Sequence, residues 1–181
     1  EEYRQKTGHE FCMGDQYVSC DYGTQNPTAF LLWSKGADKK WYCRREYYYS
    51  GRDKGRQKTD KEFSDDLTAW LSGEKVRAVI LDPAAASFKA QLEKDGYKVK
   101  KAKNDVLDGI RFVATLLLSG SIFVDKSCEN LIKEFASYIW DAKAAERGED
   151  KPVKEHDHAL DALRYFCYTI IRRGGGIRIL K

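Results

Sequence analysis

The strongest constraint on the fold of this chain is the order in which its strand-like and helix-like segments occur. Three strand-like segments come first, at residues 16–21, 28–34 and 40–50, and each is rich in aromatic or β-branched residues. Short stretches that contain Gly, or Asn followed by Pro, separate them. Consecutive strands joined by such turns pair side by side, so this part of the sequence predicts an antiparallel meander.

After the meander, helix-like and strand-like segments alternate. Thr59 and Glu62 form a capping-box pattern where the first helix opens. The predicted helices cover residues 60–72, 84–95, 105–119, 128–140 and 156–173, and the predicted strands cover residues 77–82, 97–102 and 121–125. This order predicts an α/β fold with one mixed central sheet, which combines the antiparallel meander with the later strands and carries helices on both faces.

Residues 141–155 break the alternation, because they are polar and charged and contain Gly148 and Pro152. A helix extension, a hairpin that turns near Arg147 and Gly148, and a loop all fit the segment. Periodicity does not choose among these three structures.

The composition indicates one compact domain without a membrane segment. The chain has 181 residues, of which 42% are hydrophobic, and no apolar run approaches the roughly 20 residues of a membrane helix. Lys and Arg number 32 against 28 Asp and Glu, and the net charge of +4 is too small to indicate nucleic acid by itself. The five cysteines form no C-x-x-C pair, which predicts reduced thiols in a cytoplasmic protein. Because the chain opens without Met, we expect a fragment of a longer protein.

Three acidic residues lie where this fold would bring them together. Asp21 and Asp82 each end a predicted strand, and Asp161 lies among the apolar residues of the last helix, which must dock on the sheet. Taken singly, Asp21 and Asp82 also fit turn or helix-cap residues, and Asp161 also fits a solvated helix face. Together they would repel one another strongly unless cations compensate them.

Carboxylate oxygens favour Mg²⁺ or Mn²⁺, and two such ions about 4 Å apart can hydrolyse a phosphodiester. His158 precedes Asp161 by three positions and can face the same site, or it can be a hydrogen-bonded residue of the helix start. Asp157 is a secondary candidate, which we expect at the exposed helix start, where it would interact with the helix dipole. The residues therefore predict a two-metal site built on Asp21, Asp82, Asp161 and His158.

The stretches "SCDYGTQNPTAF", "VILDPAAASF" and "YIWDAKAAERGEDKPVKEHDHALDALRYF" resemble the C-terminal nuclease domain of the large terminase subunit of tailed bacteriophages. The resemblance covers residues 16–168. It implies an RNase H-like endonuclease in which Asp21, Asp82 and Asp161, with His158 added, bind two divalent cations and cut concatemeric viral DNA during packaging. It also implies a hairpin for residues 141–155, beside the active site.

The same resemblance sets the expected domains and partners. Residues 1–15 would be a linker remnant, 16–173 the RNase H-like nuclease domain and 174–181 a flexible tail. The chain has no G-x-x-x-x-G-K-[ST] motif, so the packaging ATPase domain of the full-length protein would be absent here. Double-stranded DNA, the small terminase subunit and the portal are the implied partners, in the cytoplasm of the infected bacterium, with no membrane.

Two groups of cations are candidates for contacts with DNA phosphates, although charge runs are usually solvated. They are Arg44, Arg45, Arg52, Lys54, Arg56 and Lys58 in one group, and Lys143, Arg147, Lys151 and Lys154 in the other. Nothing in the sequence resembles a base-reading helix, so we expect cleavage without sequence preference. The alternatives are another RNase H-like nuclease, such as a resolvase, and a catalytically silent module that docks on the portal or the small subunit.

Overall fold

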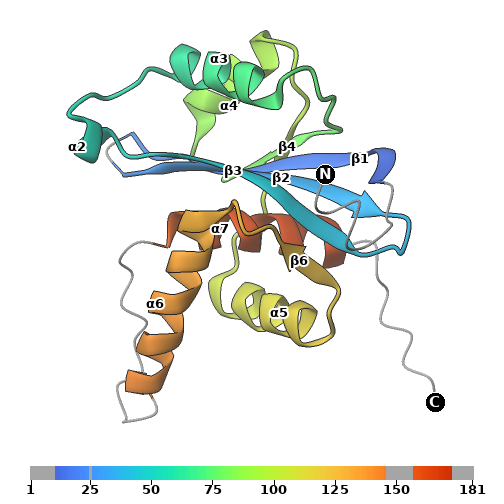
Figure 1. The fold of residues 1–181 in the computed structure, drawn as a ribbon. Helices are drawn as coiled ribbons and strands as arrows, with labels where there is room; N and C mark the ends of the chain where they lie inside the picture. Colours follow the sequence, from blue (N-terminus) through green and yellow to red (C-terminus); the bar gives the residue numbers. More distant parts are fainter. Residues whose placement is uncertain (1–10, 25, 146–156, 173–181) are drawn as a thin grey trace.

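The computed structural model describes residues 11–24, 26–145 and 157–172, and it gives only the backbone of residues 11–14 and 138–145. Six strands form one sheet in the order β5-β4-β1-β2-β3-β6 (Figure 1). The strands are β1 (Phe11–Asp21), β2 (Thr28–Gly36), β3 (Trp41–Tyr49), β4 (Val79–Leu81), β5 (Val99–Lys101) and β6 (Ile122–Val124). The helices are α2 (Gly51–Lys54), α3 (Asp60–Leu71), α4 (Ala86–Lys94), α5 (Val106–Leu118), α6 (Glu129–Ala145), α7 (His158–Phe166) and the π-helix η1 (Cys167–Ile171).

The pairing of the strands confirms the predicted mixed sheet. β1, β2 and β3 form the antiparallel meander, while β4 pairs parallel to β1, β5 parallel to β4 and β6 parallel to β3. β1 begins at Phe11, five residues before the predicted start, and its register with β2 shifts between Phe11 and Gln16. The later strands are only three residues each, so the long β1, β2 and β3 form the body of the sheet.

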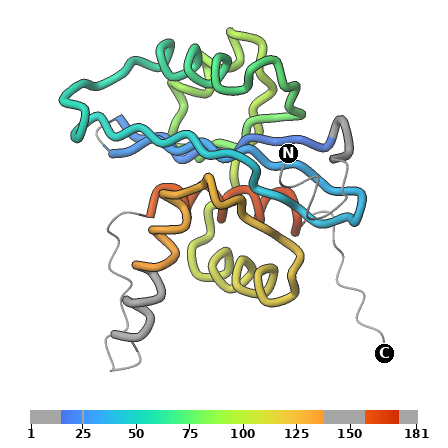
Figure 2. The backbone as a smooth tube through the Cα atoms, in the orientation of Figure 1, coloured from blue at the N-terminus to red at the C-terminus, as the bar shows by residue number. Residues whose placement is uncertain are grey.

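Helices cover both faces of this sheet, as the sequence predicts. In Figure 1, α3 and α4 lie above the sheet and α5, α6 and α7 lie below it. Figure 2 shows the chain passing from the upper layer to the lower one after α4 and β5. Two hydrophobic cores result: Phe30, Phe63 and Phe88 belong to the upper core, and Trp33 stacks on Phe166 of α7 in the lower core.

A β-bulge in the meander changes which face the residues of β3 occupy. Leu32 pairs with Arg45 and Trp33 with Cys43, so Arg44 has no partner of its own in the register. Cys43 belongs to the lower core, whereas Arg44 and Arg45 both reach Glu74 in the segment after α3.

Beyond the bulge the normal alternation resumes. Tyr47 therefore packs on the α3 side, and Tyr48 packs on the α7 side.

Several helical segments differ from the sequence prediction. The short α2 forms inside the predicted polar loop, and the last helix continues as a π-helix after Phe166. α6 runs to Ala145, so residues 141–145 extend this helix and do not form a hairpin, while residues 146–155 lie outside the described part of the chain. No helix in the described ranges has the length and apolar character that crossing a bilayer requires.

Candidate active site

Asp21 and Asp82 lie side by side at one end of the sheet. Asp21 is the last residue of β1, and Asp82 directly follows β4. Cys20 pairs with Leu81 in the parallel register, which places the two aspartates next to each other. Because side chains alternate along a strand, and Cys20 and Leu81 face the α3–α4 core, Asp21 and Asp82 face α7.

α7 brings His158 and Asp161 to the same end of the sheet. Ala159, Ala162 and Phe166 are fully buried against the sheet, which fixes the rotation of the helix about its axis. In this rotation Nδ1 of His158 lies 2.9 Å from Oδ2 of Asp21. The structure therefore joins two of the residues that the sequence singled out, although 137 positions separate them.

Each of the three aspartates has its own hydrogen-bond partner. Asp21 contacts His158, whereas Asp82 accepts the backbone N–H of Ala84 at 2.7 Å and the side-chain amide of Asn104 at 3.3 Å. Asp82 thus has the turn role considered from the sequence and also a place at the site. The third carboxylate, Asp161, accepts two hydrogen bonds from the guanidinium of Arg164, at 2.8 and 3.2 Å.

Arg164 is itself held firmly below the sheet. Its side chain is only 5% exposed, and its Nη1 donates to the carbonyls of Asn104 and Asp105 at 2.8 and 3.2 Å. Gly109 of α5 makes room for it, since a Cβ at that position would lie 2.8 Å from Cγ of Arg164. Arg164 therefore links Asp161 to the segment that carries Asn104, the partner of Asp82.

Burial and the neighbouring carboxylates both disfavour the charged forms of the acids in this cluster. Burial raises the pKa of Asp21, and the charges of Asp157 and Asp82 raise it further, against the opposing effect of His158. Burial likewise raises the pKa of Asp161, with Asp157 and Asp21 adding to it and Arg164 opposing. Burial alone would lower the pKa of His158, but the hydrogen bond and charge of Asp21, with Glu134 and Asp157, raise it overall.

Asp157 is half-buried, whereas the sequence predicted an exposed position. It lies close enough to Asp21 and Asp161 to raise both of their pKa values, and it lines a groove together with Asp161. This groove has a volume of about 190 Å³ and runs between α5 and α7, with mostly apolar walls. Asp157 and Asp161 are therefore reachable from the surface.

The sequence analysis missed two residues of this region. Burial raises the pKa of Tyr165, and the charges of Asp21, Asp161 and Asp82 raise it further. Its position one helical turn after Asp161 was the available signal. The second residue, Glu134 of α6, is 5% exposed and accepts the backbone N–H of Leu160 at 2.9 Å. Its place in an ordinary amphipathic helix gave no signal in the sequence.

The donor chemistry of the site suits a divalent cation, because carboxylate oxygens and one imidazole converge at an accessible edge. As the side chains lie, no three His, Cys, Asp or Glu among the described residues are arranged to hold an ion. Each of the three carboxylates instead has a hydrogen-bond partner of its own: His158 for Asp21, Asn104 for Asp82 and Arg164 for Asp161.

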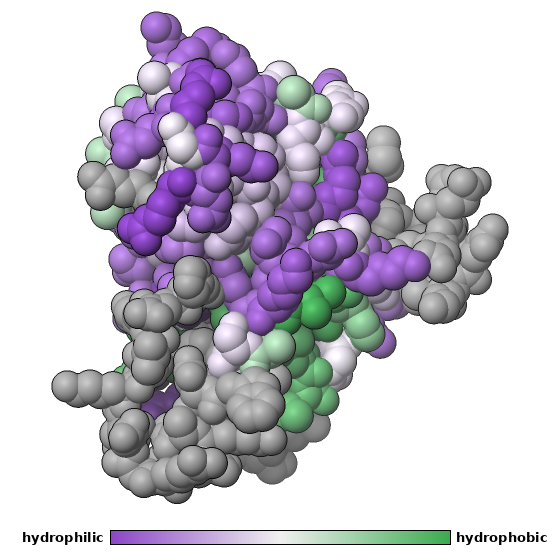
Figure 3. Space-filling view, turned by 60° about the vertical axis from the view of Figure 1, so that its left-hand side comes forward, coloured by the Kyte–Doolittle hydropathy of each residue, from purple (hydrophilic) through white to green (hydrophobic). Residues whose placement is uncertain are grey.

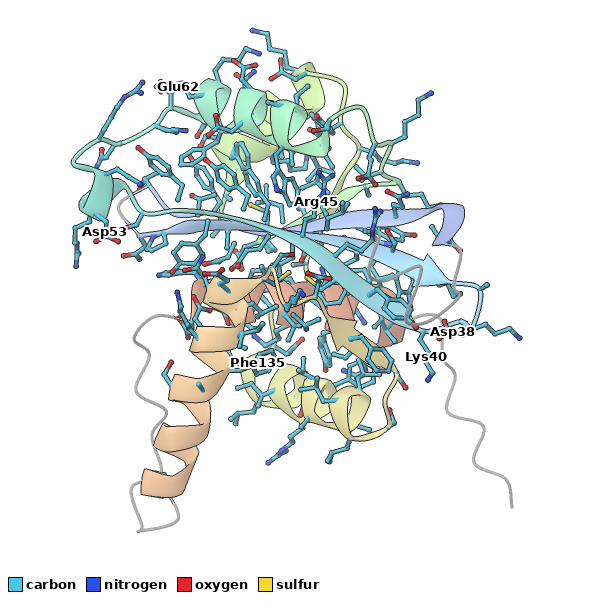
Figure 4. All side chains as sticks on the ribbon, viewed as in Figure 1. Asp38, Lys40, Arg45, Asp53, Glu62 and Phe135 are labelled. Atoms are coloured by element: carbon cyan, nitrogen blue, oxygen red, sulfur yellow. The ribbon has the colours of Figure 1, made fainter. Side chains whose placement is uncertain are left out.

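The structure divides the first group of predicted DNA contacts. Figure 4 shows Asp53 of α2 at the end of the sheet where β1 and β3 finish, and Arg45 between the sheet and α3. Arg52 and Lys54 of α2 are exposed and make no ion pair with the described residues, so they are free to meet a ligand near the site.

The other cations of that group are paired. Arg44 and Arg45 bind Glu74 at 2.8 and 2.7 Å, Arg56 pairs with Glu62, and Lys58 pairs with Asp66. Arg45 also lies three residues before Tyr48, which is level with Asp21 across the sheet, so it is set back by roughly 10 Å. The side chain of Lys143 and the residues Arg147, Lys151 and Lys154 lie outside the described part of the chain.

Figure 3 turns the site end toward the reader. Hydrophilic side chains cover the α3–α4 half, and a hydrophobic patch lies in the lower half, where α5 is. Leu107, Leu117 and Leu118 of α5 and Ile132 of α6 are among the exposed apolar residues.

Comparison with known protein families identifies the family of this chain. The model of the terminase RNase H-like domain matches residues 19–168, which include all four candidate site residues. The chain belongs to the terminase RNase H-like domain family. Its mixed sheet, with an antiparallel β1-β2-β3 meander and helices on both faces, is the RNase H-like fold of these nuclease domains.

Individual relatives agree with this family. A large terminase subunit of Escherichia phage T5 is 32% identical over 160 residues, which are 86% of this chain and 35% of the T5 protein. The structure of a large terminase from a thermophilic bacteriophage is 53% identical, with a TM-score of 0.80, over 88% of this chain and 41% of that one. The chain thus spans well under half the length of these terminases.

More distant structures share the fold alone. The nuclease domain of the P22 large terminase is 24% identical, with a TM-score of 0.66, and the match covers 90% of this chain and 84% of that domain. The large terminase nuclease of a second thermophilic phage, G20c, solved with bound zinc, is 15% identical, with a TM-score of 0.55, over 87% of this chain and 80% of that one. A metal has therefore been seen in a terminase nuclease of this fold.

Proposed function

We propose that this terminase domain is a divalent-metal-dependent DNA endonuclease that cuts without sequence preference. The observation that carries the proposal is the convergence of Asp21, Asp82 and Asp161, from two strands and a distant helix, at one accessible end of the sheet. The raised pKa values of Asp21 and Asp161 support it, because burial and neighbouring carboxylates both disfavour their charged forms, which a bound cation would favour.

Asp21, Asp82 and Asp161 are the proposed ligands of two Mg²⁺ or Mn²⁺ ions, with His158 as an added ligand. When bound, such ions activate a water and stabilise the leaving oxygen of the phosphodiester. The chain itself orients the carboxylates: Asn104 and the N–H of Ala84 hold Asp82, and Arg164 holds Asp161. Arg164 and His158 also offset part of the negative charge of Asp161 and Asp21.

In the phage, we propose that this activity cuts concatemeric viral DNA during genome packaging, in the cytoplasm of the infected bacterium. The packaging ATPase domain of the full-length subunit, the small terminase subunit and the portal are the proposed partners. Arg52 and Lys54 supply few phosphate contacts, so the domain alone should bind DNA weakly, with an affinity that falls steeply with salt.

Incubation with supercoiled plasmid tests the activity. With Mn²⁺ or Mg²⁺ we expect nicked, then linear, then smaller products with no preferred position, and EDTA should stop the reaction. A domain that binds DNA but never cuts it with either ion would be a docking module. Cleavage that persists in EDTA would rule out the metal-dependent chemistry. Glu74→Gln, which changes an acid far from the site, is the matched control and should cut like the parent.

A further inference from the structure

Glu134 is a buried carboxylate that the proposed chemistry does not use. It lies on α6, is 5% exposed, and one of its oxygens, Oε2, accepts the backbone N–H of Leu160 at 2.9 Å. The Tyr48 hydroxyl and the backbone N–H of Ala159 also interact with this carboxylate, and both lower its pKa against the larger effect of burial. Burying a carboxylate is costly, and an apolar side chain of similar size would avoid that cost.

The bond to Leu160 replaces the cap that α7 lacks in its own sequence. The first N–H groups of a helix have no partner within the helix and are usually satisfied by the side chain of the N-cap residue. Asp157 is the N-cap residue of α7, but its side chain makes no capping bond. Glu134 reaches across from α6 and accepts the N–H of Leu160, the third residue of α7.

A second carboxylate makes the same kind of contact at the start of the preceding helix, α6. Glu46 of β3 accepts the N–H groups of Asn130 and Leu131, at 2.9 and 3.0 Å, in the first turn of α6. The sheet thus fixes the start of α6, and α6 fixes the start of α7. His158 and Asp161 lie within that first turn of α7, and the Glu46 and Glu134 contacts therefore connect the central sheet to the candidate ligands.

We propose that Glu134 is a positioning residue, which caps α7 in place of Asp157 and so holds His158 and Asp161 toward Asp21 and Asp82. The inference rests on the proposed function of that site. Because Glu134 supplies the cap, the Asp157 carboxylate stays free to add its charge to the cluster of acids. A residue that only filled space in the core could be exchanged for an apolar one without effect on the site.

Two substitutions separate these roles. Glu134→Gln keeps an oxygen that accepts the N–H of Leu160, and Glu134→Met keeps the volume but removes the acceptor. We expect Gln to leave the Mn²⁺ affinity and the rate of plasmid nicking within about 3-fold of the parent. Met should weaken Mn²⁺ binding, measured by calorimetry with the metal alone, and slow nicking by about 10- to 100-fold, as outer contacts of metal ligands do. Equal Mn²⁺ affinity and equal rates in both variants would overturn the proposal.

Hydrogen exchange without metal keeps this test independent of the proposed function. The amide of Leu160 should exchange at least about 10-fold faster in Glu134→Met than in the parent, and near the parental rate in Glu134→Gln. The matched control is Glu46→Met, which should speed exchange at Asn130 and Leu131 more than at Leu160. If the parent neither binds Mn²⁺ nor cuts DNA, the proposed function fails, while the exchange pattern still decides the capping role. Unchanged exchange at Leu160 in Glu134→Met would refute that role.

Discussion

The two faces of the sheet treat their acidic residues in opposite ways. On the α3–α4 face, acids meet cations and hydrogen-bond donors at the surface: Glu74 pairs with Arg44 and Arg45, and Asp95 accepts bonds from Ser64 and Gln91. On the α7 face, Asp21, Asp82, Asp157, Asp161 and Glu134 gather with His158 and Arg164 as the neighbouring cations.

The pKa values follow this difference. The hydrogen bond from Ser64 and the one from Gln91 lower the pKa of Asp95, and the backbone of Thr59 lowers that of Glu62. Burial raises the pKa of Asp21, Asp161 and Glu134 on the opposite face. The acids of the α3–α4 face stabilise the fold. The buried acids of the α7 face are retained at a cost in stability, which is the pattern expected of a functional site.

The largest difference in activity should appear between two variants, each with one acid replaced on one face of the sheet. Asp161→Asn should reduce plasmid cleavage at least about 100-fold, because a metal ligand matters more than the outer contacts that contribute 10- to 100-fold. Its melting temperature without metal should stay near that of the parent, since the Asn oxygen still accepts from Arg164. Asp66→Asn, which weakens the contacts to Tyr47 and Lys58, should cut normally and melt at a lower temperature. Full activity of Asp161→Asn would remove the distinction between the faces.

The second prediction concerns pH. Burial raises the pKa of Glu134 from about 4.5 to about 7, so the folded state binds this proton more tightly than the unfolded state does. Its contribution to the free energy of unfolding is therefore greatest below pH 4.5 and falls by about 3 kcal/mol as the pH rises through 7. Urea unfolding in EDTA at pH 5 and pH 8 should show this fall in the parent and a smaller one in Glu134→Gln. Equal falls in both proteins would contradict the assignment to Glu134.

A smaller difference in cleavage rate should separate substitutions of His158 and Asp157, which both lie on the α7 face. His158→Ala removes the contact to Asp21 and should slow cleavage by about 10-fold or more, with an altered preference between Mg²⁺ and Mn²⁺. Asp157→Asn should cost less, because it relieves repulsion on Asp21 and Asp161 without removing a proposed ligand. Rates with each ion test both. If Asp157→Asn is inactive while Asp161→Asn cuts, the two aspartates have exchanged roles.

The smallest expected effect concerns DNA affinity. Replacing both Arg52 and Lys54 with Ala should weaken binding a few-fold and reduce the slope of log affinity against log salt by up to about 2, since each phosphate contact contributes about 0.9. Arg45→Ala, on a cation held by Glu74, should lower the melting temperature and leave the slope unchanged. A salt titration of both variants decides which group meets DNA.

The sequence could predict those features that depend on residues close together in the chain. Asp21, Asp82 and Asp161 were found because strand ends and the apolar stripe of a helix are visible within a few residues. The contact of Glu134 with Leu160 was not predictable, because it depends on how α6 and α7 pack. The ion pair between Asp161 and Arg164, three positions apart on one helix, has a local signal that the sequence analysis did not use.

The cations of β3 show how a small irregularity defeats a prediction from sequence. Arg44 and Arg45 looked like one end of a basic stretch that could meet DNA. The bulge at Leu32 and Trp33 turns both of them to the α3 side, where Glu74 holds them. Bulges depend on the partner strand, so the sequence of β3 alone does not reveal them.

The separation of 137 positions between His158 and Asp21 has a consequence for how the protein is made. At translation rates of about 5–20 residues per second, α7 leaves the ribosome roughly 7–27 seconds after the end of β1. In the later part of that interval a nascent chain carries Asp21 and Asp82 but not the helix with His158 and Asp161. The order of synthesis therefore delays assembly of the complete set of acids until the last helix has emerged.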